Sequence, residues 1–456
     1  MIILFTIIAL LLGGGMFFIS RDKKIAIMFI GCMTLTLLKP DLPFFKESTR
    51  FFIYMFFLSE IPHVYAILKE WWLSPLKYTF SFLLAAVLLA ALFSPHINSL
   101  DSLLSFLKSE LLFKYLAIGY SFVSFRNERN LKTLVRFSIL PMIILTMVGV
   151  INLVEHRSFF VSEMMSYWSS NSINDVNEMA GDKFTNLDRF RVQAMFFNPF
   201  DYGYICSLCL LLYVYAFNFK MINRYQFIGL ISCCLFGILF CGCRTVIFCS
   251  ISAVCIYYLL AFKIEKFVAY GLFSILLLIT AYLYVPIVNE KIEAMTTMFT
   301  DTKGQNYNGS NIEARSIQLA ATLSYIQDSP MFGRGVNFFN VDLGWSGGKE
   351  MALDSRLLGL EGVYLYYLLE RGFVGYILYL LVWLSIVTFL IQKKKHNKKL
   401  SSLGISIWVT YVLFANMTGE LLSVYPTLLL LGCIIGVLTY SNKRQEVLKK
   451  NQGFQL

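Results

Sequence analysis

Three arginines lie at positions where an apolar sequence rarely has a charge. Arg191 begins the segment RVQAMFFNPFDYGY, Arg244 interrupts the apolar run FGILFCGCRTVIFCSISAV, and Arg315 lies near the start of SNIEARSIQLAATLSYIQDSP. A guanidinium stays charged at physiological pH and donates two parallel hydrogen bonds to phosphate oxygens. Three such groups together would suit a pyrophosphate. Each arginine also has a local explanation, either a side chain that reaches the membrane surface or an ion pair, such as Arg191 with Asp188 or Asp201.

Glu361 is the candidate for proton transfer. It precedes a tyrosine-rich apolar helix in LGLEGVYLYYLLERGFVGYILYLL, 358–381, where membrane and water are expected to meet. A carboxylate partly removed from water takes up a proton more readily, as a general base must. The helix dipole alone also favours an acidic residue at this place, so both explanations stay open. Tyr364 could stack on a sugar ring or belong to an interfacial aromatic belt, and Glu370 and Arg371 are expected to form a packed polar pair.

The sequence lacks the recognised motifs of nucleotide and metal chemistry. Its four histidines, His63, His96, His156 and His396, are scattered without ligand spacing, and no Walker, DxD or GxSxG motif occurs. The ten cysteines all fall in or at the ends of apolar runs, which excludes a disulfide framework or a thiolate metal site. We therefore expect neither a metal nor a cofactor.

The composition is that of a membrane protein. Hydrophobic residues make up 57% and charged residues 15%, with a mean hydropathy of +0.65. A soluble domain has about 25% charged residues. The net charge of +11 could indicate nucleic-acid binding, but most lysines and arginines fall in short loops between apolar runs, where they orient helices. We expect contact with membrane lipids and no nucleic acid, and an all-α polytopic fold.

The apolar runs predict thirteen membrane spans, or twelve or fourteen if the short second span is lost or divided. Every second loop is short and basic, as cytoplasmic loops are, and only the outer loop 39–50 departs from this rule. The run KKKHNKK at 393–399 is interpreted as such a topology signal. This pattern predicts that the N-terminus lies on the outer side of the membrane and the C-terminus in the cytoplasm. The predicted spans are 1–18, 25–38, 51–68, 78–94, 109–125, 138–155, 202–219, 227–243, 246–262, 267–288, 372–391, 402–420 and 426–441.

Two long hydrophilic segments fall on the predicted outer side, where external chemistry is expected. In the second, Ser310 and Glu313 form a capping box that begins an amphipathic helix, and Pro330 with the GRG at 333–335 ends it. The predicted organisation is N-terminal spans 1–155, outer loop 156–201, central spans 202–288 with the Arg244 turn, large outer loop 289–360, C-terminal spans 361–441 and a cytoplasmic tail 442–456.

Four outer-side motifs occur in an order that resembles a known family. They are R-x4-F-x-N-P-x3-G from Arg191 to Gly203, Arg244 behind Gly242, E-x-R with P-x-x-G-x-G from Glu313 to Gly335, and E-x-G-x-x-G from Glu370 to Gly375. Over residues 185–440 the chain is similar to the bacterial O-antigen polymerase and ligase superfamily, the Wzy-type polymerases and WaaL-type ligases. Ligases of this family have His, usually followed by Asn, where this chain has Glu361-Gly362, which favours a polymerase.

The resemblance implies a metal-independent, inverting glycosyltransferase of the GT-C type at the outer face of the bacterial inner membrane. Its donor and acceptor would be polyprenyl-pyrophosphate-linked glycans, with a chain-length regulator protein as a candidate partner. Arg191, Arg244 and Arg315 would bind the pyrophosphate, and Glu361 would be the catalytic base. Further candidate substrate contacts are Arg189, Asn198, Arg334 and Tyr364.

Three alternatives remain open from the sequence. The first is a ligase, or an enzyme that moves the glycan to a lipid or protein acceptor. The second is a flippase or exporter of lipid-linked oligosaccharides, although the asymmetric outer loops and the absence of an internal repeat argue against it. The third is a membrane scaffold, which would not need an arginine at the Arg244 turn.

Overall fold

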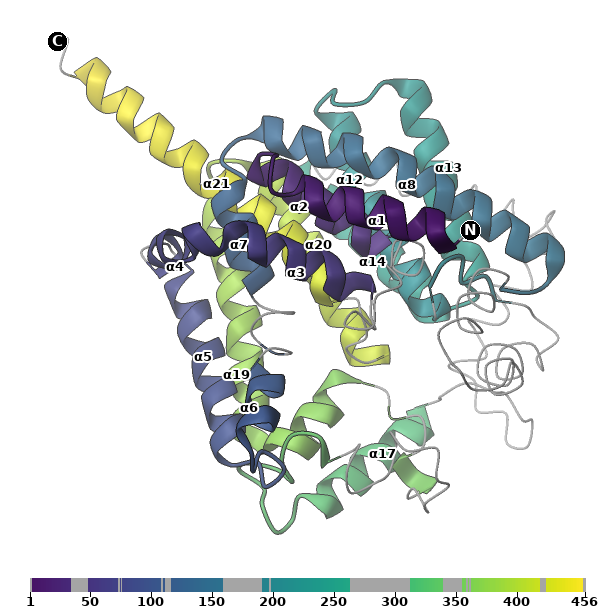
Figure 1. Cartoon of the computed structure of the whole chain (residues 1–456), viewed down its shortest axis with the longest axis vertical. Helices are drawn as coiled ribbons and strands as arrows, with labels where there is room; N and C mark the ends of the chain where they lie inside the picture. Colours follow the sequence, from purple (N-terminus) through teal and green to yellow (C-terminus); the bar gives the residue numbers. More distant parts are fainter. Residues whose placement is uncertain are drawn as a thin grey trace.

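The computed structural model describes residues 2–33, 48–72, 74, 76–107, 110, 116–158, 191–196, 198–262, 312–338, 355–357, 360, 362–418 and 424–453. Every regular element in these ranges is a helix (Figure 1). The elements are α1 Ile2–Gly15, α2 Arg21–Met33, α3 Ser48–Glu60, η1 Ile61–His63, α4 Val64–Trp72, α5 Lys77–Leu92, α6 Leu100–Leu107, α7 Leu116–Ser124, α8 Glu128–Glu155, α12 Pro199–Asn218, α13 Arg224–Phe240, α14 Arg244–Ala261, α17 Ile312–Tyr325, η4 Ser355–Leu357, α19 Val363–Lys393, α20 Lys398–Thr418 and α21 Val424–Gly453.

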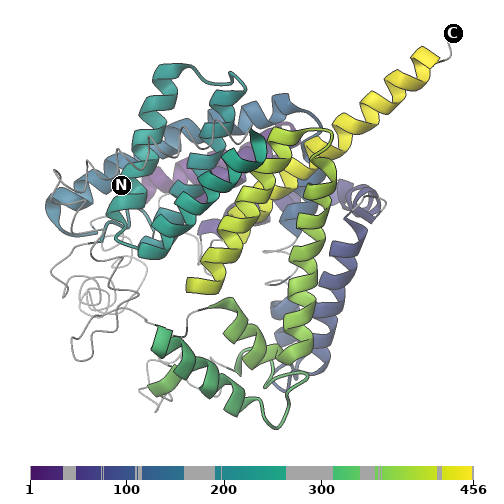
Figure 2. The same cartoon turned by 180° about the vertical axis from the view of Figure 1, so that it is seen from behind.

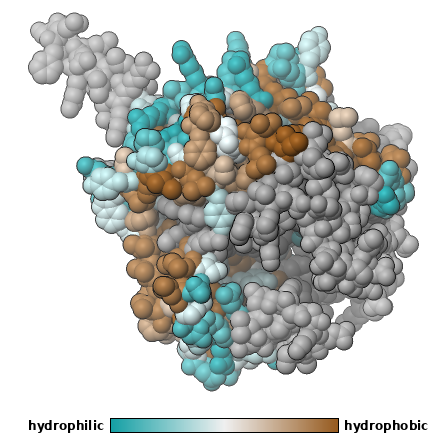
Figure 3. Space-filling model, viewed as in Figure 1, coloured by the Kyte–Doolittle hydropathy of each residue, from teal (hydrophilic) through white to brown (hydrophobic). Residues whose placement is uncertain are grey.

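The protein is a helical membrane protein. Five helices, α8, α12, α14, α19 and α20, are long and apolar enough to cross a bilayer, and a sixth span results if the bent pair Tyr54–Trp72 and Lys77–Leu92 counts as one. Arg224–Phe240 and Tyr425–Ser441 are shorter apolar helices. Hydrophobic surface lies between hydrophilic groups at the top and bottom of the view in Figure 3. The expected span 267–288 lies outside the described residues.

Several elements differ in extent from the expected spans. α8 begins at Glu128, ten residues before the expected 138, because Asn127 caps it by accepting a hydrogen bond from the Asn130 N–H at 3.2 Å. α21 continues as a helix through Gly453, into the segment expected to be a tail, and projects away from the bundle (Figure 1). The amphipathic helix of the second hydrophilic segment is present as α17, whereas Ser310 of its expected capping box lies outside the described residues.

α12 is buried along nearly its whole length among α8, α13, α14 and α20. Small and hydroxyl side chains allow this close packing, as is common between membrane helices. A β-carbon on Gly203 would lie 2.6 Å from the Cys241 sulfur, and the Tyr204 hydroxyl is 2.6 Å from the Thr427 hydroxyl. α12 is therefore the central helix of the main core.

α12 and α14 run in the same direction, and α20 runs opposite to both. At one end, Gly203 of α12 faces Val246 of α14, and the Tyr204 ring lies 4.4 Å from that of Phe414 in α20. At the other end, the Lys399 ammonium at the start of α20 lies over the rings of Phe219 and Phe262, which follow α12 and α14. The starts of α12 and α14 thus share one end of the bundle with the end of α20. We call this the Arg244 end.

A second, smaller core lies beside α17, away from the main bundle (Figure 2). Its buried side chains come from α17, the segment after it, η4 and the first turns of α19. α19 thus takes part in both cores, because its later turns pack against α5 and α20. The members are Ala321, Ile326, Phe338, Leu357, Leu360, Leu365 and Leu369.

Candidate functional site

Arg191 lies against the turn between α13 and α14. The Val192 N–H donates to the Phe240 carbonyl at 2.9 Å, which holds the chain in place beside the end of α13. A β-carbon on Gly242 would lie 2.9 Å from Arg191 Cγ, so the aliphatic part of Arg191 crosses directly over this glycine. Gly242 has a φ of +67°, a conformation that glycine adopts readily and other residues rarely.

Arg244 is the first residue of α14 and follows the same turn. Cys243 is the N-cap and makes no side-chain capping hydrogen bond. Backbone N–H groups at a helix start carry partial positive charge that adds to that of a nearby guanidinium. Arg191 and Arg244, which lie more than fifty residues apart in sequence, therefore belong to one cationic turn, and both side chains are half-buried.

Arg315 reaches the same end of the bundle from α17. Its Nη2 donates to the Met417 carbonyl in the last turn of α20. The end of α20 packs beside the start of α14, so this contact brings the α17 arginine to the Arg244 end. The structure thus places the backbone segments that carry the three arginines at one end of the bundle.

Glu361 itself lies outside the described residues, but its neighbour Gly362 is placed. A β-carbon on Gly362 would lie 3.0 Å from the Asn416 carbonyl oxygen and 2.8 Å from Tyr364 Cε1. Gly362 and Arg315 therefore approach consecutive carbonyl groups, those of residues 416 and 417, at the end of α20. The start of α19 and the start of α17, which carries Arg315, therefore both lie against the end of α20.

Two of the further candidate contacts have local partners. Asn198 is the N-cap of α12, and its Oδ1 accepts a hydrogen bond from the Phe200 N–H at 2.9 Å. Arg334 donates from Nε to the Tyr325 carbonyl at the end of α17, and its Nη2 lies 2.6 Å from Asp328 Oδ2. Asn198 thus caps a helix at the Arg244 end, whereas Arg334 bonds at the end of α17 that is farther from Arg315. Arg189 lies outside the described residues.

The segment Pro330–Gly335 is hydrogen-bonded into a break in α19. Gly372 has φ 62° and ψ −165° inside the helix, which interrupts its regular hydrogen bonds. The segment supplies replacements in both directions, and we call this four-bond exchange the α19 lock. Arg334 and Gly335 donate to the carbonyls of Leu369 and Glu370 at 2.8 and 3.0 Å, while Phe373 and Val374 donate to those of Pro330 and Met331 at 2.9 and 3.1 Å.

The α19 lock gives a physical reason for two of the sequence motifs. The glycines of P-x-x-G-x-G and E-x-G-x-x-G come together there, because Gly333 faces Gly372 with no room for a side chain on either. The end of α5 supports the same segment, since the Phe93 ring stacks on Phe332 with ring centroids 3.7 Å apart. The lock holds α17 and the first turns of α19 in a fixed relation.

Sequence analysis did not single out the buried Glu110. Its Oε2 lies 3.1 Å from Arg371 Nη2, and both side chains are less than a tenth exposed. The Arg371 guanidinium also lies 4.6 Å from the centre of the Tyr367 ring. This ion pair of Arg371 thus crosses to another part of the chain, and the pairing with Glu370 that the sequence suggests stays a prediction. A carboxylate within the apolar run LLSFLKSELLFKYL was the available signal.

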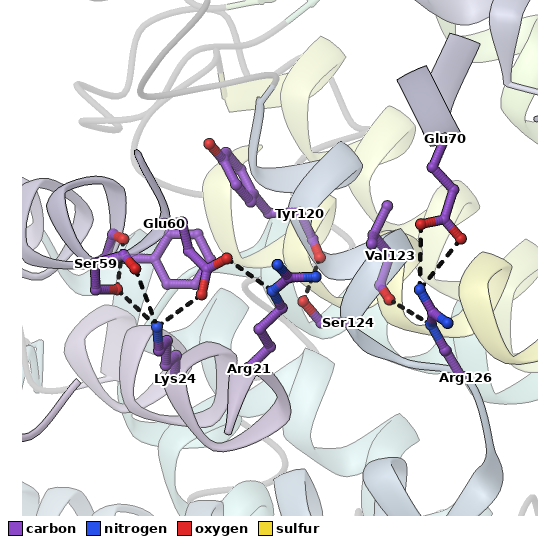
Figure 4. Close-up of polar contacts among 10 residues, drawn as sticks. Arg21, Lys24, Ser59, Glu60, Glu70, Tyr120, Val123, Ser124 and Arg126 are labelled. Atoms are coloured by element: carbon purple, nitrogen blue, oxygen red, sulfur yellow. Dashed lines mark hydrogen bonds and ion pairs between the residues drawn. The ribbon is translucent and has the colours of Figure 1, made fainter. Parts of the chain in front are cut away.

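A second buried carboxylate, Glu60, lies in a polar cluster with basic residues of α2 (Figure 4). Its oxygens lie 2.7 Å from Arg21 Nε and 2.7 Å from Lys24 Nζ. Nearby in the same view, Arg126 Nη2 lies 3.2 Å from Glu70 Oε2 in a more exposed pair. In the sequence, these cations indicate only the topology of the loops. The charge of Glu60 within the apolar run FFLSEIPHVYAIL is the feature that indicates a buried partner.

The chemistry available at the Arg244 end is cationic. In the part of the chain that the structure describes, no group of three or more His, Cys, Asp or Glu side chains is placed to hold a metal ion. Guanidinium groups and a helix start are the functional elements there, and they suit a ligand with several negative charges.

Comparison with known proteins adds no relative. No protein family model and no curated protein matches the sequence. The likeness to the O-antigen polymerase and ligase superfamily therefore rests on the four motifs and their order alone.

Proposed function

We propose that this protein is a polymerase of the bacterial inner membrane. It transfers a polyprenyl-pyrophosphate-linked glycan, of the O-antigen or capsule kind, onto another lipid-linked repeat unit at the outer face. One observation supports this most strongly. Arg191 and Arg244 share a single turn, and Arg315 and Gly362 approach neighbouring carbonyls at the adjacent end of α20.

The proposed reaction is one in-line displacement. The acceptor sugar hydroxyl forms a bond to the anomeric carbon of the donor, while the bond from that carbon to the pyrophosphate oxygen breaks. Arg191, Arg244 and Arg315 stabilise the charge that grows on the pyrophosphate, as preorganised cations do. Glu361 accepts the proton of the hydroxyl. The displacement inverts the anomeric configuration and needs no metal, because the leaving group arrives already activated on the lipid.

The proposed topology places the Arg244 end at the outer face. Thirteen spans, with the N-terminus outside and the C-terminus in the cytoplasm, put the segments 156–201 and 289–360 beside it. The basic segments around Arg126, Lys220 and Lys393 to Lys399 then lie in the cytoplasm, in agreement with the positive-inside rule. A GT-C-like arrangement of this kind leaves the lipid-linked substrates in the bilayer and their glycans in the outer compartment.

The test is a surface-glycan ladder in the native host, compared between wild type, a deletion strain and the variants Arg244→Ala, Arg315→Ala and Glu361→Gln. Arg224→Ala is the matched control, because Arg224 is also the first residue of an apolar helix but lies next to the opposite end of α12. Membrane levels of each variant are measured in parallel by immunoblotting.

The expected result is a ladder that collapses to a single repeat unit in the deletion strain and in the three site variants, with a full ladder for Arg224→Ala. Long chains that remain on the lipid carrier without reaching their acceptor would instead identify a ligase. Repeat units trapped on the cytoplasmic side would identify a flippase. A full ladder in site variants present at normal levels would refute the proposed site.

A further inference from the structure

Helix α4 has an exposed apolar row, whose last member, Trp72, also makes an edge contact with the Phe80 ring of α5 at 5.7 Å between ring centroids. Four large side chains recur at spacings of four, three and four residues, so they form one stripe along η1 and α4. The opposite side of the helix is buried, with Ile67 and Trp71 packed toward α7. The members of the stripe, with their exposed fractions, are Ile61 61%, Tyr65 78%, Leu68 37% and Trp72 52%.

The two ends of this helical segment are tied to basic loops. Glu60, immediately before it, pairs with Arg21 and Lys24 in the first turn of α2, directly after the loop that follows α1. Glu70, near its end, pairs with Arg126 in the loop between α7 and α8 (Figure 4). Both loops lie on one side in the proposed topology. A segment with both ends on one side runs along the membrane surface.

Its length and its direction agree with such a position. The helical segment from Glu60 to Glu70, ten steps along the chain, extends about 15 Å, half of the ~30 Å hydrocarbon core. The segment Tyr54–Trp72, which joins the end of α3 to α4, is bent by 111° relative to Lys77–Leu92, so the chain turns sharply between α4 and α5. Figure 1 shows α4 nearly end-on at the edge of the molecule, while α3 and α5 are seen from the side. Ser74 closes the turn, because its hydroxyl bonds to the Trp71 carbonyl and accepts the Leu76 N–H.

We propose that α4 lies flat on the cytoplasmic leaflet and inserts its stripe among lipids with anionic head groups. Tyr and Trp favour the membrane–water interface, and an amphipathic helix with a basic border binds anionic bilayers. Lys69 and Lys77 are exposed beside the stripe and would face the head groups. Within the expected span 51–68, α4 then forms no part of the segment that crosses the membrane. This inference depends on the proposed orientation and not on the proposed polymerase activity.

The test uses the full-length protein in vesicles, with an environment-sensitive fluorophore on one introduced cysteine. Tyr65→Cys and Leu68→Cys report on the stripe, and Ala66→Cys is the matched control, since Ala66 is exposed on another side of the same helix. The parent chain, labelled in the same way, measures the background fluorescence that comes from the native cysteines. Quenching by lipids that carry a nitroxide near the head group, or deep in the acyl chain, locates each fluorophore.

We expect the shallow quencher to act several-fold more strongly at positions 65 and 68 than at 66, and more strongly in vesicles of phosphatidylglycerol than of phosphatidylcholine. A membrane-impermeant maleimide should modify the Ala66→Cys variant from the cytoplasmic side only. Absence of quenching at 65 and 68 would overturn the proposal in favour of a stripe that meets water or protein. Strong deep quenching at all three positions would mean that α4 crosses the bilayer. Equal quenching in both lipids would overturn the assignment to anionic lipid, and modification from outside would overturn the leaflet.

Discussion

Gly333 and Gly372 meet backbone to backbone at the break in α19. A β-carbon on Gly333 would lie 2.6 Å from the Gly372 nitrogen, and one on Gly372 would lie 2.5 Å from the Met331 carbonyl carbon. Both residues also have positive φ. Two motifs that lie far apart in the sequence thus depend on each other, because neither glycine can be replaced without moving the backbone that faces it.

Replacement of Gly372 by alanine should therefore destabilise the protein. Its φ of 62° and ψ of −165° belong to a region that a residue other than glycine adopts only at a cost of roughly 1–3 kcal/mol. The clash of the new methyl group with Met331 adds to this cost. Thermal unfolding in detergent measures the effect. The control is Gly229→Ala in α13, where a β-carbon meets nothing within 4 Å and where alanine should stabilise the helix by ~0.5–1 kcal/mol. Equal stability of the two variants would contradict the α19 lock.

Gly242→Ala should disturb the candidate site without replacing any residue that is proposed to bind the substrate or to transfer a proton. The added methyl would lie 2.9 Å from Arg191 Cγ and would occupy a residue with a φ of +67°, so Arg191 must leave the turn. We expect a shorter glycan ladder at an unchanged membrane level. If chain length stays at the wild-type value while crosslinking shows Arg191 displaced, Arg191 has no part in pyrophosphate binding.

The Glu110–Arg371 pair should show strong coupling. Removal of one partner leaves a buried, uncompensated charge, which costs about 3–5 kcal/mol, whereas removal of both is far less harmful. A double-mutant cycle with Glu110→Gln and Arg371→Gln, followed by thermal unfolding, measures this coupling. Additive single effects would show that the 3.1 Å contact contributes nothing specific.

Glu60 and Glu70 should differ sharply although both form ion pairs. Glu60 is 1% exposed and pairs with two cations, so Glu60→Gln should cost on the order of 3–5 kcal/mol. Glu70 and Arg126 are 33% and 55% exposed, and solvent-exposed pairs contribute less than about 1 kcal/mol. Unfolding temperatures of the two glutamine variants make the comparison. A larger loss at Glu70 would show that α4 is held mainly at its second end.

The sequence predicted the helices of the site better than their contacts. A charge between two apolar runs located the Arg244 turn, and a capping signature with a later proline located α17. Hydropathy patterns describe only residues that are close in the sequence. They therefore could not show that Arg191 lies over Gly242 or that Arg315 bonds to the Met417 carbonyl. Those contacts depend on how α14 and α20 pack, which is a property of the whole bundle.

Two features were missed for different reasons. The break at Gly372 is hidden because glycine occurs in membrane helices without breaking them, and only the partner segment 330–335 stabilises the break. Glu60 and Glu110 did give a signal, a carboxylate inside an apolar run, which predicts a buried partner but not its identity. The partners, Arg21 with Lys24 and Arg371, lie on other helices.

The α19 lock also sets an order for membrane insertion. Residues 330–335 are synthesised before α19, so in the proposed topology they are already outside when α19 enters the bilayer. Backbone groups at Gly372 lack helical partners, and such groups are costly in lipid until they are bonded. The earlier segment supplies those bonds as soon as α19 arrives. We therefore expect this segment to assist the insertion of the helix that follows it, and a chain interrupted between the two should hold α19 in a form that proteases cleave more readily.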